Sequence, residues 1–97
     1  MISLTLNYEP PFNEITKILS ENIKFDKELS LKELLNFLKK QYGEEFYELL
    51  WDKKKKEEIN YFLSIIINGH NFRDNNFLGT QLKDKDDLTF LYIYFGG

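Results

Sequence analysis

The fold is decided by the segment SLKELLNFLKKQYG, which occupies residues 30–43. Ser30 and Glu33 have the spacing of a helix capping box, in which each side chain accepts a hydrogen bond from the other residue's backbone N–H. Leucines follow at helical spacing and form one apolar stripe. Gly43 suits the position just beyond the last turn. The segment therefore predicts an amphipathic helix over residues 31–42.

Two strands are predicted before this helix. Apolar and polar residues alternate over residues 2–8, which is the pattern of a strand with one buried face. Residues 19–25 alternate in the same way, whereas residues 12–18 are compatible with either a helical turn or a loop. Because the N-terminus alternates and lacks a basic region, we interpret it as a strand and not as a signal peptide.

A short helix and a third strand are predicted after residue 43. Apolar residues at helical spacing predict the helix over residues 44–51. Residues 61–67 are aromatic and β-branched and predict the strand. Asn68-Gly69 has turn chemistry and is expected to end it.

The chain closes with a charged turn at residues 83–87 and a strand predicted over residues 88–95. Two early strands, one crossover helix and later strands indicate an α+β domain that spans residues 1–97. The natural solution is a β-grasp fold, a mixed sheet wrapped on one main helix, with the first and last strands parallel at its centre.

Composition excludes several classes of function. The chain has 97 residues, no cysteine and a net charge of −3. It therefore has no disulfide, thiolate metal site or cysteine nucleophile. The charge argues against a nucleic-acid partner, and no stretch is apolar enough to span a membrane. A domain without cysteine suits the reducing cytosol, so we expect a cytoplasmic protein.

Gly96 and Gly97 follow the last predicted strand directly. Glycines lack Cβ, so such a tail can enter a narrow channel and leave its terminal carboxylate unhindered. That carboxylate is ionised at neutral pH and is a poor electrophile, so a partner enzyme would have to activate it with ATP. Two terminal glycines arise by chance in roughly one chain in 200. The pair therefore indicates a function only in combination with the predicted fold that precedes it.

Several motifs in this order resemble the β-grasp ubiquitin-like sulfur carriers and modifiers, the MoaD/ThiS-like family. The resemblance covers most of the chain and is strongest over residues 63–97. The residues that carry it are Leu63-Ser64-Ile65-Ile66-Ile67-Asn68-Gly69, Leu82-Lys83-Asp84-Lys85-Asp86, Leu88-Thr89-Phe90-Leu91 and Gly96-Gly97. Residues 34–40 are similar to the ubiquitin-related modifier branch.

The resemblance implies a carrier that is not itself an enzyme. An E1-like adenylyltransferase or sulfurtransferase, using ATP and Mg, would activate Gly97 for transfer-RNA thiolation or for conjugation to target-protein lysines. No cofactor is expected on the chain itself. One alternative is the small subunit of molybdopterin synthase, with the large subunit as partner. That subunit usually has two prolines before its glycines, whereas this chain has residues 91–95, LYIYF. Another alternative is a non-conjugated ubiquitin-like binding module.

A docking face follows from strand parity. If the core residues of the last two long strands point to the helix, then Ile66, Leu91 and Ile93 point away from it. The resemblance implies that activating enzymes dock on this face, near the base of the tail. We therefore expect Ile66, Leu91 and the stretch Tyr92-Ile93-Tyr94-Phe95 to contact the partner.

Other polar residues have simpler interpretations. His70, the only histidine, is predicted in an exposed loop. The Lys53–Lys56 run is predicted to be a solvated loop, with a lysine acceptor site as the alternative. Asp84, Asp86 and Asp87 lack the pattern of a calcium loop and are predicted to form a turn.

Overall fold

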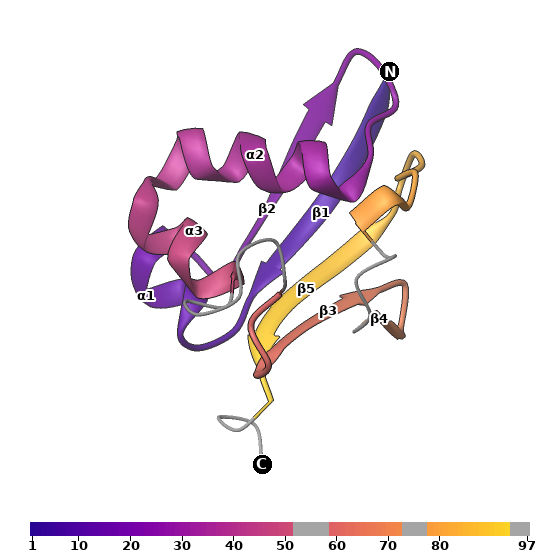
Figure 1. Ribbon diagram of the computed structural model, residues 1–97. Helices are drawn as coiled ribbons and strands as arrows, with labels where there is room; N and C mark the ends of the chain where they lie inside the picture. The colour runs from indigo at the N-terminus through magenta and orange to yellow at the C-terminus, as the bar shows by residue number, and fades with distance from the viewer. Residues whose placement is uncertain (52–58, 73–77, 94–97) are drawn as a thin grey trace.

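The computed structural model describes residues 1–51, 59–72 and 78–93. Its sheet has five strands in the order β2-β1-β5-β3-β4 (Figure 1). The elements are β1 Ile2–Tyr8, α1 Phe12–Thr16, β2 Ser20–Phe25, α2 Leu31–Tyr42, α3 Glu44–Leu50, β3 Leu63–Ile67, β4 His70–Phe72 and β5 Asp87–Tyr92. The predicted β-grasp arrangement is confirmed, and the ambiguous stretch before β2 contains the short helix α1.

The centre of the sheet is the parallel pair of β1 and β5, as predicted. Leu6 pairs with Leu88 and Tyr8 with Phe90, so the apolar positions of both strands lie on one face. β2 adds to β1 as an antiparallel strand, and β3 adds to β5 in the same way. All four core positions of β1 are buried, which explains the alternation seen in the sequence.

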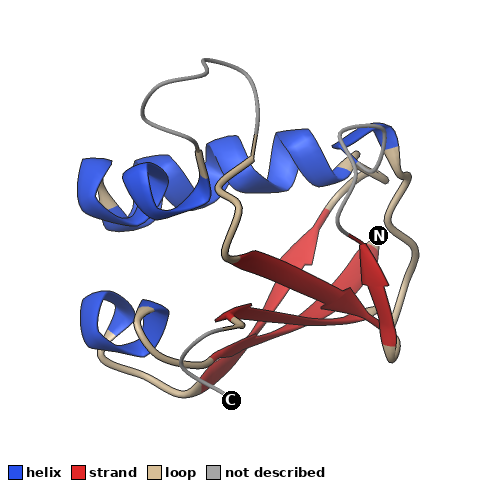
Figure 2. Ribbon diagram, turned by 60° about the horizontal axis from the view of Figure 1, so that its bottom comes forward, coloured by secondary structure: helices blue, strands red, loops and turns tan. Residues whose placement is uncertain are grey.

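Helix α2 crosses the face of the sheet that carries these apolar positions (Figure 2). Its capping box is present in full: the Glu33 N–H donates to Ser30 Oγ at 3.2 Å, and the Ser30 N–H donates to Glu33 Oε1 at 2.9 Å. Gly43 follows the last residue with φ of 92°, a left-handed conformation that glycine adopts without strain. The predicted range 31–42 is confirmed.

The core between helices and sheet is unusually aromatic at the end of β5. Phe12 of α1 lies 5.3 Å from Phe46 of α3 and 5.6 Å from Tyr92, measured between ring centroids. Tyr8 and Phe90 stack at 5.9 Å. Offset and edge-to-face pairs of this kind stabilise a core beyond the area that they bury. They fix α1 and α3 beside the last residues of β5.

Several predicted boundaries are wrong by one or two residues. The third strand begins at Leu63 and not at 61, because the Phe62 N–H bonds the Asn60 side chain at 2.9 Å and forms a turn. Helix α3 ends at Leu50, and Trp51 is already extended. The last strand covers Asp87–Tyr92 and begins one residue before the predicted start at 88. Ile93 already lies in a turn, and positions 94 and 95 of the predicted range lie outside the described residues.

The prediction that His70 lies in a loop is wrong. His70 is the first residue of β4, which pairs with β3 across the Asn68-Gly69 turn, although the histidine is exposed as expected. Asn68 and Gly69 both have positive φ, 51° and 86°, which is the geometry of a tight hairpin turn. The interpretation of Lys53–Lys56 falls outside the described residues.

Candidate functional site

The predicted site divides into a described part and a part that is not described. Tyr94, Phe95, Gly96 and Gly97 lie outside the described residues. The structure places Ile66 in β3, Leu91 in β5 and Ile93 immediately after β5, all three half-buried. The described part of the site therefore ends at Ile93, the residue before the tail.

Ile66 and Leu91 lie on the same face of the sheet, opposite α2. Ile66 pairs with Thr89, and Leu91 pairs with Ser64, so the two apolar side chains are diagonal neighbours across β3 and β5. Their parity is opposite to that of Ile65 and Phe90, which are fully buried. The orientation inferred from sequence is thus present in the structure.

The rest of this open face is polar. Ser3 Oγ bonds Asn22 Oδ1 at 2.9 Å, and the Asn22 amide donates to Thr5 Oγ1 at 3.3 Å. The Asn7 amide donates to Asp87 Oδ1 at 2.8 Å. Among the strand residues that the structure describes, Ile66 and Leu91 are the only apolar ones with this parity. Apolar surface on this face is therefore confined to the strands beside the tail.

The base of the tail is held by hydrogen bonds that sequence reasoning missed. The Tyr92 hydroxyl donates to the Leu49 carbonyl in the last turn of α3 and accepts from Asn60 Nδ2 at 3.1 Å. The Ile93 N–H donates to the Phe62 carbonyl at 2.9 Å. Tyr92 is buried, so its side chain faces the core and is not the partner contact that we expected. These contacts fix the point at which the chain leaves the sheet.

The three aspartates of the charged turn are occupied by hydrogen bonds. Asp84 Oδ1 accepts from the Ser3 N–H, and Asp86 Oδ2 accepts from the Lys83 N–H, both at 2.8 Å. Within residues 1–51, 59–72 and 78–93, no group of three His, Cys, Asp or Glu side chains could hold a metal ion. Asp84 lies in the predicted turn, whereas Asp87 is already the first residue of β5.

Two of the sequence motifs turn out to bind each other. The Asn68 amide donates to Asp86 Oδ1 at 2.8 Å, and Asn68 Oδ1 accepts from the Asp87 N–H at 2.9 Å. The Asn-Gly turn after β3 is thereby joined to the acidic turn before β5. This contact aligns β3 and β5 at the end of the sheet that is remote from the tail.

A half-buried carboxylate, that of Glu21, was also not predicted. Tyr8 and Tyr42 both donate a hydrogen bond to Glu21 Oε2, which links β1, α2 and the edge strand β2. Burial first, and then the bond to Glu21 and its negative charge, raise the pKa of Tyr42 to about 12. The same causes raise the pKa of Tyr8 further. Both phenols therefore stay protonated and keep donating at neutral pH.

The fold defines a class of protein: a ubiquitin-like β-grasp domain. The family model described as "ThiS family" matches residues 11–97. The chain therefore belongs to the ThiS family of ubiquitin-like sulfur carriers. No curated protein matches the sequence. None of the described helices is long and apolar enough to cross a membrane.

Solved structures show the same fold. CysO from Mycobacterium tuberculosis superposes with a TM-score of 0.75 at 22% identity, covering 92% of this chain and 97% of its own. A putative molybdopterin converting factor subunit 1 from Pyrococcus furiosus superposes with a TM-score of 0.72 at 20% identity, and the match covers 95% of this chain and 98% of its own. Small archaeal modifier protein 1 from Methanosarcina acetivorans superposes with a TM-score of 0.70 at 22% identity, and the match covers 95% of this chain and 93% of its own.

Proposed function

We propose that this protein is a sulfur carrier or protein modifier whose Gly97 carboxylate is activated by an E1-like enzyme. The observation that carries the proposal is the position of Gly96-Gly97, which follow the central strand β5 closely in a chain of the ThiS family. A pure binding module would not need two consecutive glycines a few residues after its central strand.

The activation is a displacement at phosphorus. A Gly97 carboxylate oxygen attacks the α-phosphorus of ATP, the bond to the β-phosphate bridging oxygen breaks, and pyrophosphate leaves. The acyl-adenylate that forms is a strong electrophile, unlike the free carboxylate. The partner enzyme supplies Mg to neutralise the phosphates during this step.

The adenylate can then react in two ways. Attack by a hydrosulfide on the acyl carbon expels AMP, releases one proton and leaves a thiocarboxylate. Attack by an enzyme thiolate expels AMP and forms a thioester, and a target-protein lysine amine then expels the thiolate and forms an isopeptide bond. No change of oxidation state occurs in either route. The catalytic groups belong to the partner, and this chain supplies the carboxylate.

The open face beside the tail is the proposed docking surface for this partner. Ile66 and Leu91 form its apolar part, and Ile93, Tyr94 and Phe95 connect it to the reacting end. An enzyme that holds Gly97 must cover the area around Ile93, because residues 94–97 can reach no further than about 14 Å. We place the reaction in the cytoplasm, where ATP is available.

The molybdopterin synthase role is the second candidate, since the Pyrococcus furiosus structure described above is named a putative molybdopterin converting factor subunit. At 20% identity that likeness supports the fold and leaves the pathway to experiment. In that role the thiocarboxylate would donate sulfur inside a large subunit, whereas a modifier would be recovered bound to lysines of other proteins.

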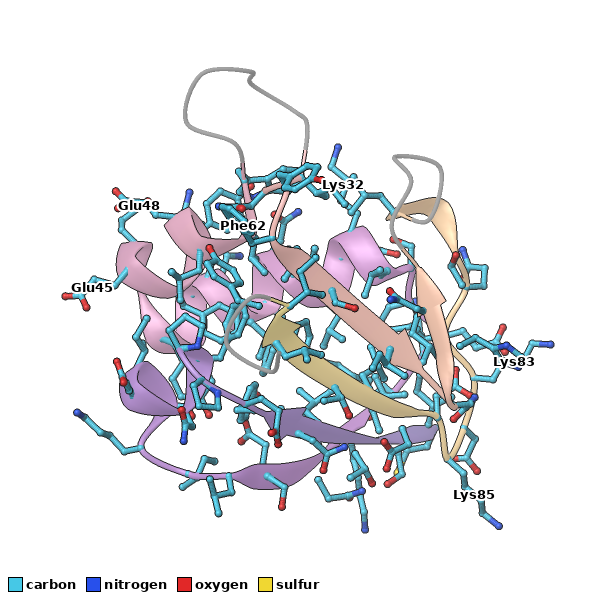
Figure 3. All side chains as sticks on the ribbon, turned by 90° about the horizontal axis from the view of Figure 1, so that it is seen from below. Lys32, Glu45, Glu48, Phe62, Lys83 and Lys85 are labelled. Atoms are coloured by element: carbon cyan, nitrogen blue, oxygen red, sulfur yellow. The ribbon has the colours of Figure 1, made fainter. Side chains whose placement is uncertain are left out.

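Intact-mass measurement tests the proposal. The protein is incubated with the E1-like adenylyltransferase of its own organism, ATP, Mg and sulfide. We expect a species carrying AMP and then one in which sulfur replaces an oxygen. Deletion of Gly97 removes both, while the Lys85→Ala variant, altered in the turn before β5 (Figure 3), keeps both. Wild-type protein that stays unmodified, with no conjugate in a cell extract, contradicts the proposal.

A further inference from the structure

Two adjacent aromatic side chains are exposed at the beginning of β3. Tyr61 is 73% exposed and Phe62 is 40% exposed, and their rings meet edge to face with centroids 5.4 Å apart. Among the residues that the structure describes, the other large apolar side chains exposed to this extent are Met1, Ile18 and Leu19. Exposed aromatic residues are enriched at protein interfaces and among the contacts that carry binding energy.

The backbone that presents this pair is rigidly built. Asn60 uses all of its polar groups: its N–H bonds the Leu50 carbonyl at 2.9 Å, and its carbonyl accepts from the Leu63 N–H at 3.0 Å. Its side-chain oxygen accepts from Phe62, and its amide donates to Tyr92. None of these four bonds involves the side chain at position 61.

The pair adjoins the point at which the tail leaves the fold. The Phe62 carbonyl accepts the hydrogen bond from the Ile93 N–H, and the Phe62 ring lies 6.4 Å from that of Tyr92. Figure 3 shows Phe62 at the beginning of β3, beside the end of β5. A protein that acts on Gly97 works within about 14 Å of Ile93, so it approaches this surface as well as the open face.

From these observations we infer that Tyr61 and Phe62 form a second contact surface for the activating enzyme. This inference rests on the proposed function, because it takes the partner to be the enzyme that adenylates Gly97. Tyr61 inserts into an apolar pocket of that enzyme, on the side of the tail next to β3. The open-face residues Ile66 and Leu91 contact the same enzyme from the neighbouring strands.

The test is the steady-state kinetics of ATP–pyrophosphate exchange with the E1-like adenylyltransferase of the same organism. Tyr61→Ser removes the ring and leaves the backbone bonds of the turn in place. We expect KM for the carrier to rise about tenfold while kcat is unchanged, because the reacting carboxylate is the same. Tyr61→Phe keeps the ring and should restore a KM close to that of the wild type.

Leu19→Ser is the matched control, because Leu19 is 70% exposed and lies beside β1 and β2, away from β3. A KM for Tyr61→Ser within twofold of the wild type overturns the inference, as does an equal rise for Leu19→Ser. Circular dichroism of each variant shows whether the fold is kept. Absence of exchange with the wild-type protein would instead contradict the proposed function, so the two failures are distinguishable.

Discussion

Asn68 acts at the scale of a single residue, through both its backbone and its side chain. Its backbone has φ of 51°, in the left-handed region that asparagine tolerates better than most residues. Its side chain donates to Asp86 and accepts from the Asp87 N–H. One residue thus forms the β3–β4 hairpin turn and joins it to the turn that precedes β5.

Replacing Asn68 with alanine should lower the free energy of unfolding by about 2–3 kcal/mol. The loss combines two hydrogen bonds with the strain of a left-handed alanine. Asn68→Gly is the matched variant, since glycine keeps the backbone conformation and loses only the bonds. Urea denaturation should place it between alanine and the wild type, and equal stabilities for the two variants would refute the backbone part of this account.

At the scale of the element, the open face combines a polar region with a small apolar one. Over β1 and β2 its hydroxyl and amide side chains bond to one another, so this surface offers little to an apolar partner. Over β3 and β5 the pair Ile66 and Leu91 interrupts the polar surface next to the tail. This contrast supports our proposal that a partner docks over β3 and β5.

Ile66→Asp and Leu91→Asp, singly and together, should raise KM for the activating enzyme in ATP–pyrophosphate exchange. Each substitution replaces half-buried apolar surface with a charge, and we expect each to raise KM about tenfold. Asn71→Asp is the control, because it adds a charge to the same face and keeps the acceptor for Ser64. Unchanged activation kinetics in the double variant, with the fold intact, would contradict the prediction that this face binds the enzyme.

Elements with local determinants are the ones that the sequence predicts well. All signals for α2, its cap, stripe and terminal glycine, lie within residues 30–43. The beginning of β3 was predicted two residues too early, because the aromatic residues 61 and 62 favour a strand, whereas the Phe62 N–H bonds the Asn60 side chain in a turn. The face of Ile66 and Leu91 follows from strand parity, whereas the anchor of Tyr92 on Leu49 spans 43 positions. The predicted contacts of Tyr94 and Phe95 stay predictions.

At the scale of the whole molecule, Glu21 connects the edge of the sheet to its main helix. It lies on β2 and accepts hydrogen bonds from Tyr8 of the central strand and Tyr42 of α2. An inward-pointing charge on an edge strand also discourages pairing with another chain. Here the hydroxyls of Tyr8 and Tyr42 donate hydrogen bonds that compensate the charge of Glu21.

This cluster should make the protein sensitive to alkali. The pKa of Tyr42 in the folded state is about 12, above its unfolded value of about 10. Its stabilising contribution is therefore complete below pH 10 and is lost as pH rises toward 12. Glu21→Gln removes the charge, so the pKa of both phenols should fall.

Ultraviolet titration of the six tyrosines measures this effect. In Glu21→Gln the last phenols should ionise at lower pH than in the wild type. Glu33→Gln, which changes the carboxylate of the α2 capping box, serves as the control. Identical titration curves for Glu21→Gln and the wild type would contradict the assignment.

The parallel pairing of β1 and β5 has a consequence for biosynthesis. The contact between Asn7 and Thr89 joins residues 82 positions apart. A growing chain can form α2 and the β1–β2 hairpin early, but the middle of its sheet stays open until β5 has been synthesised. Long-range pairing of this kind is slow and leaves strand edges exposed meanwhile. An activating enzyme that docks across β3 and β5 would consequently load sulfur only onto chains whose folding is finished.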